Sequence, residues 1–248
     1  GNPLFVIELL SYLEDMGCIV REQRGWGIKH LEIRDIPSRI HDVVIRRIEH
    51  IPEQSMRLLE CASVMGERID LEILQAVLGW ERISMLREIQ TLEKAKVLRY
   101  RNDQYIFEHP LIRKVVYENM SLPLRREYHA LLAEFYESRG MEYLDEIAHH
   151  YAMAGNRDKA VPYLIKAGDV AEKEYANLEA IRYYTQALEM MQETGFEKER
   201  IHAIEQLAKV CERIGKFEDA IRYLEAMGME AVQRRGEAEM RIASIYGK

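Results

Sequence analysis

The sequence predicts a mainly α-helical protein, with small β-hairpins in its first half and stacked helical hairpins in its second half. Three observations predict this fold. Apolar residues recur at spacings of three and four along most of the chain. Short alternating runs flanked by turn residues interrupt this pattern near residues 18–33 and 97–108. After Gly140, only Pro162 interrupts a series of helical segments separated by a few polar residues or a glycine.

Composition excludes several classes of function. Of the 248 residues, 48% are hydrophobic and 31% are charged, which is typical of folded rather than disordered chains. The formal net charge is −7, so no overall field favours nucleic acid or an anionic membrane. No apolar run approaches the roughly 18 residues that a membrane helix needs. The three widely spaced cysteines, Cys18, Cys61 and Cys211, predict buried reduced thiols, and we therefore expect a cytoplasmic protein with no membrane partner.

The first region, residues 1–35, is expected to hold one helix and one hairpin. Pro3 is typical of a first helical turn, and Gly17 ends the apolar helical pattern. Residues 18–21 and 29–33 are two short alternating runs on either side of a glycine-rich centre, which predicts a small hairpin. The sequence begins without Met and runs directly into a helix, so we expect it to be a piece of a longer protein.

The second region, residues 36–139, is expected to be a winged-helix-like domain with trailing helices. Apolar periodicity and capping residues predict helices near residues 39–50, 53–65, 70–79 and 81–96. A hairpin follows, with its turn at Asn102-Asp103. Three helices followed by a two-stranded ribbon is the order of a winged helix. Two further helices, near residues 110–120 and 123–139, complete the region.

Internal periodicity is the most informative feature of the third region, residues 140–248. The residues Ala180, Tyr184 and Ala187 recur 40 residues later as Ala220, Leu224 and Met227, and more weakly 20 residues earlier as Ala160, Leu164 and Ala167. Small side chains at these positions let antiparallel helices approach closely, and the large ones fill the space beside them. The pattern resembles the tetratricopeptide repeat, a helical hairpin of about 34 residues that stacks into a superhelix.

Two departures from that repeat accompany the resemblance. The 40-residue spacing predicts a loop insertion near residues 193–197, and the early position of the Ala160 motif predicts a shared helix or a degenerate first hairpin. A generic helical bundle is the alternative fold. The last predicted helix, residues 231–246, carries Ile242 and Ile245. Because a single hairpin cannot bury its apolar face alone, we expect the protein to continue past Lys248 or a partner to cover this face.

The repeat resemblance implies a binding face. In a superhelix of this type the first helix of each hairpin lines the concave side. The residues that this places there are Lys166, Asp169, Lys173, His202, Gln206, Lys209 and Arg213. We expect them to hold a peptide, a protein segment or a small effector, and a solvated helix face is the alternative for each. Replacing Lys209 and Arg213 together is expected to weaken a ligand while leaving the melting temperature nearly unchanged.

Motifs along most of the chain resemble a family of signalling ATPases. These motifs are Gly1-Asn2-Pro3-Leu4-Phe5, Ile36-Pro37, Ile45 with Arg47 and Ile48, Leu58-Leu59 with Ala62-Ser63-Val64-Met65-Gly66, Phe107 with His109, and Ala148-His149-His150-Tyr151. In this order they are similar to the helical lid, winged helix and sensor linker of STAND-type ATPases. These proteins are relatives of the AAA+ group and include large LuxR-type transcription regulators.

This resemblance implies a non-catalytic regulatory arm of an ATP-dependent signalling or transcription regulator. Residues 1–35 would then be a lid-like helix and hairpin. ATP or ADP is implied for the parent protein, whose nucleotide-binding core would be a further partner, with Gly1, Asn2 and Pro3 against the adenine. An ordinary first helical turn is the alternative for these three residues. The chain lacks the G-x-x-x-x-G-K-[ST] motif that cradles phosphates, so we expect no cofactor and no ATP hydrolysis in this chain itself.

Two other functions remain as alternatives, a stand-alone repeat scaffold and a winged-helix DNA-binding factor. In the second, residues 81–96 would enter the major groove. The readers would be Arg87, Gln90, Thr91 and Lys94, with Arg99 and Arg101 on the wing. Glu81, Glu88 and Glu93 interrupt this face, and specific readers combine several phosphate-contacting cations, so DNA is not the expected partner.

The histidines and carboxylates predict neither a metal site nor catalysis. His149-His150 could join His129 or His109 at a metal. However, adjacent histidines on a helix point about 100° apart, and no acidic or sulfur ligand follows at a recognisable spacing. We therefore expect surface or core histidines. No carboxylate pair or Ser/His/Asp set has a local context typical of catalysis.

Overall fold

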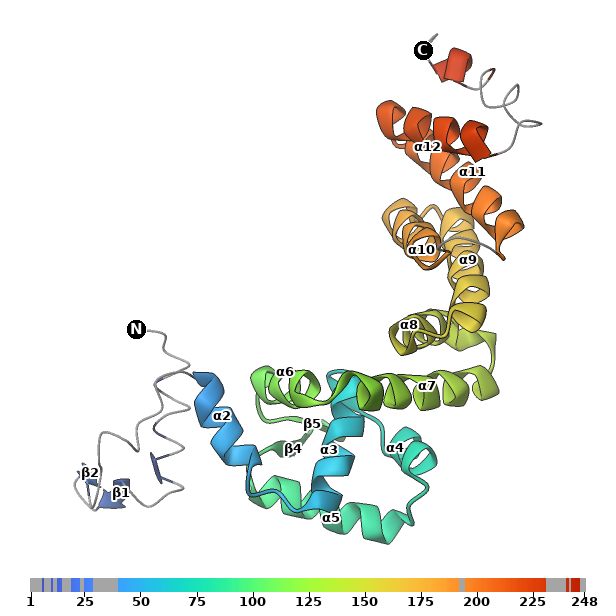
Figure 1. Cartoon of the computed structure of the whole chain (residues 1–248). Helices are drawn as coiled ribbons and strands as arrows, with labels where there is room; N and C mark the ends of the chain where they lie inside the picture. The colour runs from blue at the N-terminus through green and yellow to red at the C-terminus, as the bar shows by residue number, and fades with distance from the viewer. Residues whose placement is uncertain are drawn as a thin grey trace. The chain divides into compact units, whose positions relative to one another are not determined.

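The computed structural model describes residues 40–191 and 195–230, together with residues 19–22, 25–28 and 242–245 and five single residues, Val6, Leu10, Leu13, Glu14 and Met240. The chain divides into two compact units, Gly1–Arg125 and Arg126–Lys248. Helices dominate both units (Figure 1), which confirms the mainly α-helical class. Most of the helix predicted between Pro3 and Gly17 lies outside the described residues.

The first unit contains five described helices and five short strands. They are β1 (Ile19–Glu22), β2 (Gly25–Ile28), α2 (Ile40–Ile48), α3 (Glu53–Met65), β3 (Arg68–Ile69), α4 (Leu71–Leu78), α5 (Arg82–Lys94), β4 (Leu98–Arg101), β5 (Gln104–Phe107) and α6 (Pro110–Asn119). Local signals set several of these boundaries. The Asp70 carboxylate accepts the backbone N–H groups of Glu72 and Ile73 and caps α4, and Gly79 ends that helix in the left-handed conformation.

Strands β3, β5 and β4 form a three-stranded antiparallel sheet in that order. The β4–β5 hairpin matches the prediction, and Asn102 and Asp103 adopt φ values of 51° and 59°, as a two-residue hairpin turn requires. Strand β3 was not predicted, because its two residues carry too little alternation to be recognised. Strand β3 lies between α3 and α4 in the chain, and the winged-helix-like assignment of residues 36–139 stays a prediction.

The first hairpin differs from the prediction. Strand β2 is Gly25–Ile28, so Gly25 and Gly27 lie within the strand that pairs with β1, and the predicted run 29–33 lies outside the described residues. The register pairs Glu22 with Gly25 and Ile19 with Ile28. Residues 25–27, expected at the centre of the hairpin, therefore belong to its second strand.

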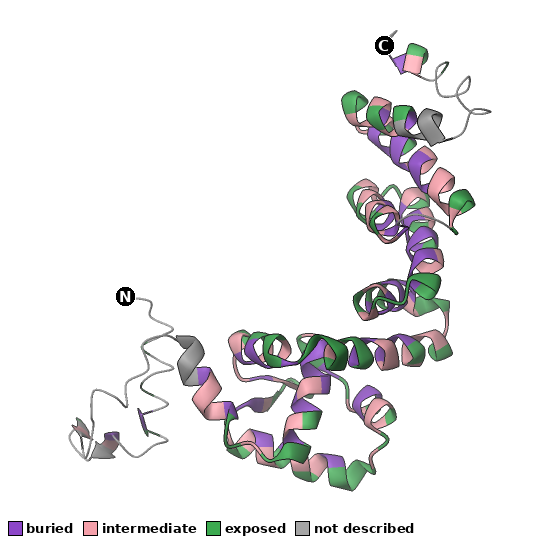
Figure 2. Ribbon diagram, viewed as in Figure 1, coloured by how far each residue is buried: buried purple, intermediate pink, exposed green. Residues whose placement is uncertain are grey.

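The core of the first unit is centred on α3. This helix contacts α4, α5, α6 and β3. Its Leu58 and Leu59 are fully buried, together with Met85 and Ile89 of α5 and Ile112 of α6. Figure 2 shows buried residues on each of the helices α3, α4, α5 and α6. Residues from distant parts of the sequence therefore converge on one helix.

The second unit is a succession of helices. They are α7 (Leu122–Arg139), whose first turn belongs to the first unit, the short 3-10 helix η2 (Met141–Tyr143), α8 (Leu144–Ala154), α9 (Arg157–Lys173), α10 (Asn177–Met190), α11 (Glu197–Arg213) and α12 (Phe217–Glu230). From α8 onward each helix packs mainly against the next one in the chain (Figure 1). Such a succession of neighbouring pairs is typical of helical repeats rather than of a single bundle.

The repeat motifs fall at equivalent places in this succession. Ala180 and Ala220 begin the motif in α10 and α12, the second helices of two hairpins, while Ala160 lies in α9, a first helix. The weak motif that begins at Ala160 therefore lies in the first helix of the hairpin whose second helix carries the Ala180 motif. Residues 191–196 connect α10 to α11, where the sequence predicts the insertion that lengthens the repeat.

Small residues let the helices of the second unit approach closely. A continuous cluster of buried side chains extends from Ala133 of α7 to Val210 of α11. Within it, a Cβ added to Gly168 would lie 2.6 Å from the Tyr184 ring, so only glycine fits there. A second cluster joins α11 and α12, and Ile245 packs into it with 5% of its surface exposed. Among the described residues, no helix is both long and apolar enough to cross a bilayer.

Candidate functional site on α9 and α11

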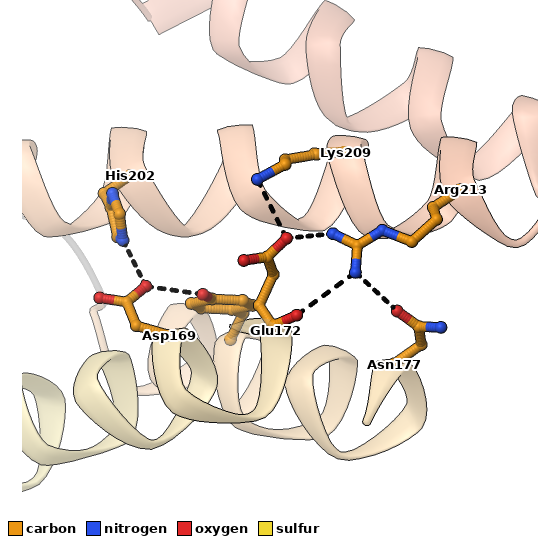
Figure 3. A network of polar contacts seen from close by, with 7 residues as sticks. Asp169, Glu172, Asn177, His202, Lys209 and Arg213 are labelled. Atoms are coloured by element: carbon orange, nitrogen blue, oxygen red, sulfur yellow. Dashed lines mark hydrogen bonds and ion pairs between the residues drawn. The ribbon is translucent and has the colours of Figure 1, made fainter. Parts of the chain in front are cut away.

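The seven residues predicted for the binding face lie on two helices in contact. Lys166, Asp169 and Lys173 belong to α9, and His202, Gln206, Lys209 and Arg213 belong to α11. These are the first helices of consecutive hairpins, and they contact each other as well as their own second helices. Figure 3 shows that side chains from the two helices point toward one another.

Asp169 is the centre of one half of this polar contact. Its Oδ1 accepts the Tyr184 hydroxyl at 2.7 Å and His202 Nε2 at 2.7 Å (Figure 3). Because a carboxylate only accepts hydrogen bonds, Nε2 of His202 carries the proton in this arrangement. Burial and the hydrogen bond to Asp169 raise the pKa of the Tyr184 hydroxyl, so it remains a donor at neutral pH. One carboxylate thus joins α9, α10 and α11.

Glu172 is the centre of the other half. Its carboxylate accepts Lys209 Nζ at 3.0 Å and forms an ion pair with the Arg213 guanidinium. Arg213 also donates to the backbone oxygen of Glu172 and to Oδ1 of Asn177, both at 3.3 Å. The hydrogen bond from Lys209 and the neighbouring Arg213 hold the pKa of Glu172 below its ordinary value.

We call these seven side chains the inter-repeat network: Asp169, Glu172, Asn177, Tyr184, His202, Lys209 and Arg213. Four of the predicted binding residues belong to it and are engaged with one another or with Glu172. Their charges are therefore largely compensated inside the protein. A ligand that contacted them would compete with existing hydrogen bonds, whereas the network itself fixes one repeat against the next.

The other three predicted residues are outside the network. Lys166 and Lys173 are exposed on α9, and Lys166 Nζ lies 5.2 Å from the centre of the Tyr163 ring. Gln206 is half-buried on α11. The two lysines are thus predicted binding residues that are exposed and lie outside the network.

Sequence analysis missed three members of the network. Glu172 lies three residues after Asp169, so the two carboxylates share a helix face, and this spacing was a usable signal. Tyr184 was recognised as a motif residue but only as a packing residue. Asn177 carries no local signal, because it meets Arg213 across 36 positions in the chain.

Two large apolar side chains are exposed at the turn between α9 and α10, beside the network. Tyr175 and Leu178 are 74% and 70% exposed, and the Arg213 guanidinium lies 5.2 Å from the centre of the Tyr175 ring. Tyr175 has a φ of 61°, which is uncommon for a residue with a side chain. This turn therefore adds aromatic and aliphatic surface next to the cations of α11.

The residues predicted for DNA reading are only partly available. Arg87, Gln90 and Lys94 are exposed on α5, but the Thr91 hydroxyl is bonded to the backbone oxygen of Arg87. On the ribbon, Arg101 is exposed, while Arg99 pairs with Glu108 at 3.5 Å. DNA binding by this surface stays a prediction, which an anisotropy titration at low salt tests. The predicted adenine-side residues Gly1, Asn2 and Pro3 lie outside the described residues.

Comparison with known proteins gives one match. The family model of the tetratricopeptide repeat matches residues 203–238, which include most of α11 and all of α12. No curated protein and no solved structure shows significant similarity to this chain. The helical pairs of the second unit and this match show tetratricopeptide-like helical repeats in the C-terminal part of the chain. Repeats of this type generally mediate protein–protein interaction.

Proposed function

We propose that this chain is the non-catalytic sensor arm of an ATP-dependent signalling or transcription regulator in the cytoplasm. Its helical repeats bind a protein segment, and binding biases how the arm packs on the regulator's own nucleotide-binding core. The observation that carries this proposal is the tetratricopeptide match at residues 203–238 within a longer run of neighbouring helical pairs.

The partner-binding part of the proposal is supported by the surface around the inter-repeat network. Lys166 and Lys173 present cations on α9, and Tyr175 and Leu178 expose further side-chain surface near the end of that helix. Aromatic and cationic side chains next to one another are typical of protein-binding surfaces. The network supplies a rigid base for them, because it holds α9 and α11 in one register.

The regulator part of the proposal is supported by the order of elements and motifs. A unit of helices and a small three-stranded sheet precedes the repeats, and sequence motifs that resemble those of STAND-type ATPases occur in both units. The stand-alone scaffold is the second candidate, and the repeat match favours it equally. The two candidates differ in what precedes Gly1 in the gene.

Sequencing the gene upstream of Gly1 separates the two candidates. We expect a P-loop motif within roughly one to three hundred residues of Gly1, the size of one nucleotide-binding domain. A start codon directly before Gly1 would leave the stand-alone scaffold as the function.

Site-specific photo-crosslinking in the native cell tests partner binding. A photoreactive amino acid at Lys166 or Lys173 is expected to give an adduct with one and the same protein. The matched controls are Arg182 and Glu189, which are exposed on α10. Adducts of equal yield at the control positions, or none at the two lysines, would contradict binding on this face.

A further inference from the structure

Three histidines from two helices gather near the start of the second unit. His129 belongs to α7, and His149 and His150 belong to α8. One ring nitrogen from each residue can be chosen so that all three atoms lie within 4.8 Å of one another. Two of these rings are in direct contact, since Nδ1 of His129 lies 2.8 Å from Nδ1 of His150.

The cluster is buried on one side and open on the other. His129 and His150 are 2% and 4% exposed, whereas His149 lies at the surface. The ring of Tyr136 stacks on His150 with an interplanar angle of 9° and a centroid distance of 5.7 Å, which holds the plane of that imidazole. The cluster therefore has two fixed members and one member at its rim.

We propose that His129, His149 and His150 bind one divalent transition-metal ion of the zinc class. Neutral imidazole suits Zn²⁺, Cu²⁺ and Ni²⁺, whereas Mg²⁺ and Ca²⁺ prefer oxygen ligands. Three histidines with a water in the remaining position is a known arrangement for zinc.

The distances allow this coordination after small side-chain movements. A Zn–N distance of about 2.0–2.1 Å places two nitrogens of a tetrahedral site about 3.3 Å apart. The Nδ1 atoms of His129 and His150 have to separate slightly from 2.8 Å. The ligand nitrogen of His149 has to move closer to the other two ligand nitrogens. It can do so because the His149 side chain lies at the surface. Because His149 is exposed, solvent water can supply the remaining ligand.

The metal-free state has its own hydrogen bond. At 2.8 Å, one Nδ1 of the His129–His150 pair carries a proton and the other accepts it. On metal binding the shared proton moves to the other nitrogen of its own ring, so both Nδ1 atoms become available without net proton release.

Titration of the metal-free full chain with Zn²⁺ tests the proposal. The protein is prepared without a histidine tag, which would itself bind metal, and is treated with a chelator first. We expect saturation at one equivalent in calorimetry and a rise in melting temperature with Zn²⁺ concentration. Co²⁺ in the same site is expected to give visible absorption typical of a four- or five-coordinate nitrogen site.

Two variants and one control make the test specific. His149→Ala removes the exposed ligand and is expected to lower the Zn²⁺ affinity by at least about tenfold, with unchanged circular dichroism. His50→Ala removes an exposed histidine of the first unit and is expected to leave affinity unchanged. His150→Asn keeps an amide that can hydrogen-bond His129, so it tests a buried ligand with less risk to folding.

Either of two results would overturn the proposal. One is the absence of saturable binding of one equivalent. The other is an affinity in His149→Ala or folded His150→Asn equal to that of the unchanged protein. In both cases the three histidines would be a packed and hydrogen-bonded cluster only.

Discussion

The two units bury their apolar side chains in different ways. In the first unit α3 is the common partner of α4, α5 and α6, so buried residues from separate parts of the sequence share one core. In the second unit each helix packs mainly on its neighbours in the chain, and the buried cluster extends from Ala133 to Val210 without a central element. The first core is built by several helices around one shared helix, whereas the second extends from each helix to the next along the chain.

This difference determines how far a local defect spreads. Because the helices of the first unit share a single core, we expect this unit to unfold in one cooperative transition. A repeat array is approximately a sum of hairpin stabilities and nearest-neighbour interfaces, so a defect in one hairpin affects mainly that hairpin and the next. The two units of one chain therefore allow a direct comparison under identical conditions.

The largest expected effect comes from removing one fully buried leucine in each unit. Leu59 lies on α3 and Leu224 on α12, and both have 0% of their surface exposed. Each Leu→Ala change is expected to cost about 2–5 kcal/mol through lost burial and the cavity left behind. The measurement is hydrogen exchange with mass spectrometry, resolved by peptide.

The pattern of exchange is the informative result. Leu59→Ala is expected to reduce protection throughout α3, α4, α5 and α6, because all of them depend on the same core. Leu224→Ala is expected to reduce protection in α11 and α12 and to leave α8 and α9 near their original values. Uniform loss across the second unit would show that the repeats unfold as a block.

A second change tests the close approach that the repeat motif predicts. Gly168→Ala introduces a Cβ 2.6 Å from the ring of Tyr184, which is fully buried. We expect a loss of about 1–3 kcal/mol from overpacking, larger than the roughly 1 kcal/mol that alanine contributes to a helix. Urea unfolding measures the loss, and repeating the change in a Tyr184→Leu background is the control. An equal loss in both backgrounds would mean that the ring is not the cause.

Sequence analysis succeeded where the determining signals are local. Local signals act within a few residues: Asp70 caps α4, Gly79 ends it, and Asn102-Asp103 form the turn between β4 and β5. The helix and hairpin that these signals delimit agree with the prediction. Small and large residues at helical spacing also identified the pairs of the second unit, because these contacts are between neighbours. The tetratricopeptide resemblance rested on the same short-range pattern.

The same analysis failed where partners are distant in the chain. Strand β3 is defined only by its pairing with β5, and the register of β1 and β2 depends on which residues meet across the turn. The carboxylate of Glu172 pairs with Arg213, which follows it by 41 positions in the sequence. His129 contacts His150, which follows it by 21 positions. Helix periodicity indicates which face a residue occupies, but not which side chain of another helix faces it.

The free energy of unfolding of the second unit is expected to depend on pH through one carboxylate near the start of the unit. Glu137 accepts hydrogen bonds from Lys159 Nζ, Tyr151 and Tyr163, contributed by α8 and α9. These bonds, that of Lys159 first, lower the pKa of Glu137 to about 2. The unfolded chain, with an ordinary carboxyl pKa near 4.5, therefore takes up a proton before the folded chain does.

The sign of the effect follows from this order. The hydrogen bonds to ionised Glu137 stabilise the folded state fully above about pH 4.5, and this stabilisation is lost progressively as the pH falls toward 2. Because 28% of the Glu137 side chain is exposed, solvent screening reduces the contribution to about 1–2 kcal/mol. Glu137→Gln is expected to lower stability at pH 7 and to flatten its pH dependence below 4.5. The control is Glu134→Gln, at an exposed position on the same helix, and equal pH profiles for the two variants would refute this role of Glu137.

The smallest expected effect concerns the inter-repeat network, which joins two helices, α9 and α11, that are not neighbours in the chain. Sequence analysis placed Lys209 and Arg213 on a ligand-binding face and expected their joint replacement to weaken the ligand while leaving the melting temperature nearly unchanged. The structure pairs both with Glu172, whose side chain is only 14% exposed. We therefore expect Lys209→Ala/Arg213→Ala to cost about 1 kcal/mol, because a half-buried carboxylate loses both of its cations.

A double-mutant cycle isolates this contribution. In a Glu172→Gln background the same double change is expected to cost only a few tenths of a kcal/mol, since no carboxylate remains to be left unpaired. Thermal unfolding at low and high salt measures both differences, and salt should reduce the first more than the second. If the cost is the same in the two backgrounds, the network does not couple the repeats, and α9 and α11 are held together by apolar contacts alone.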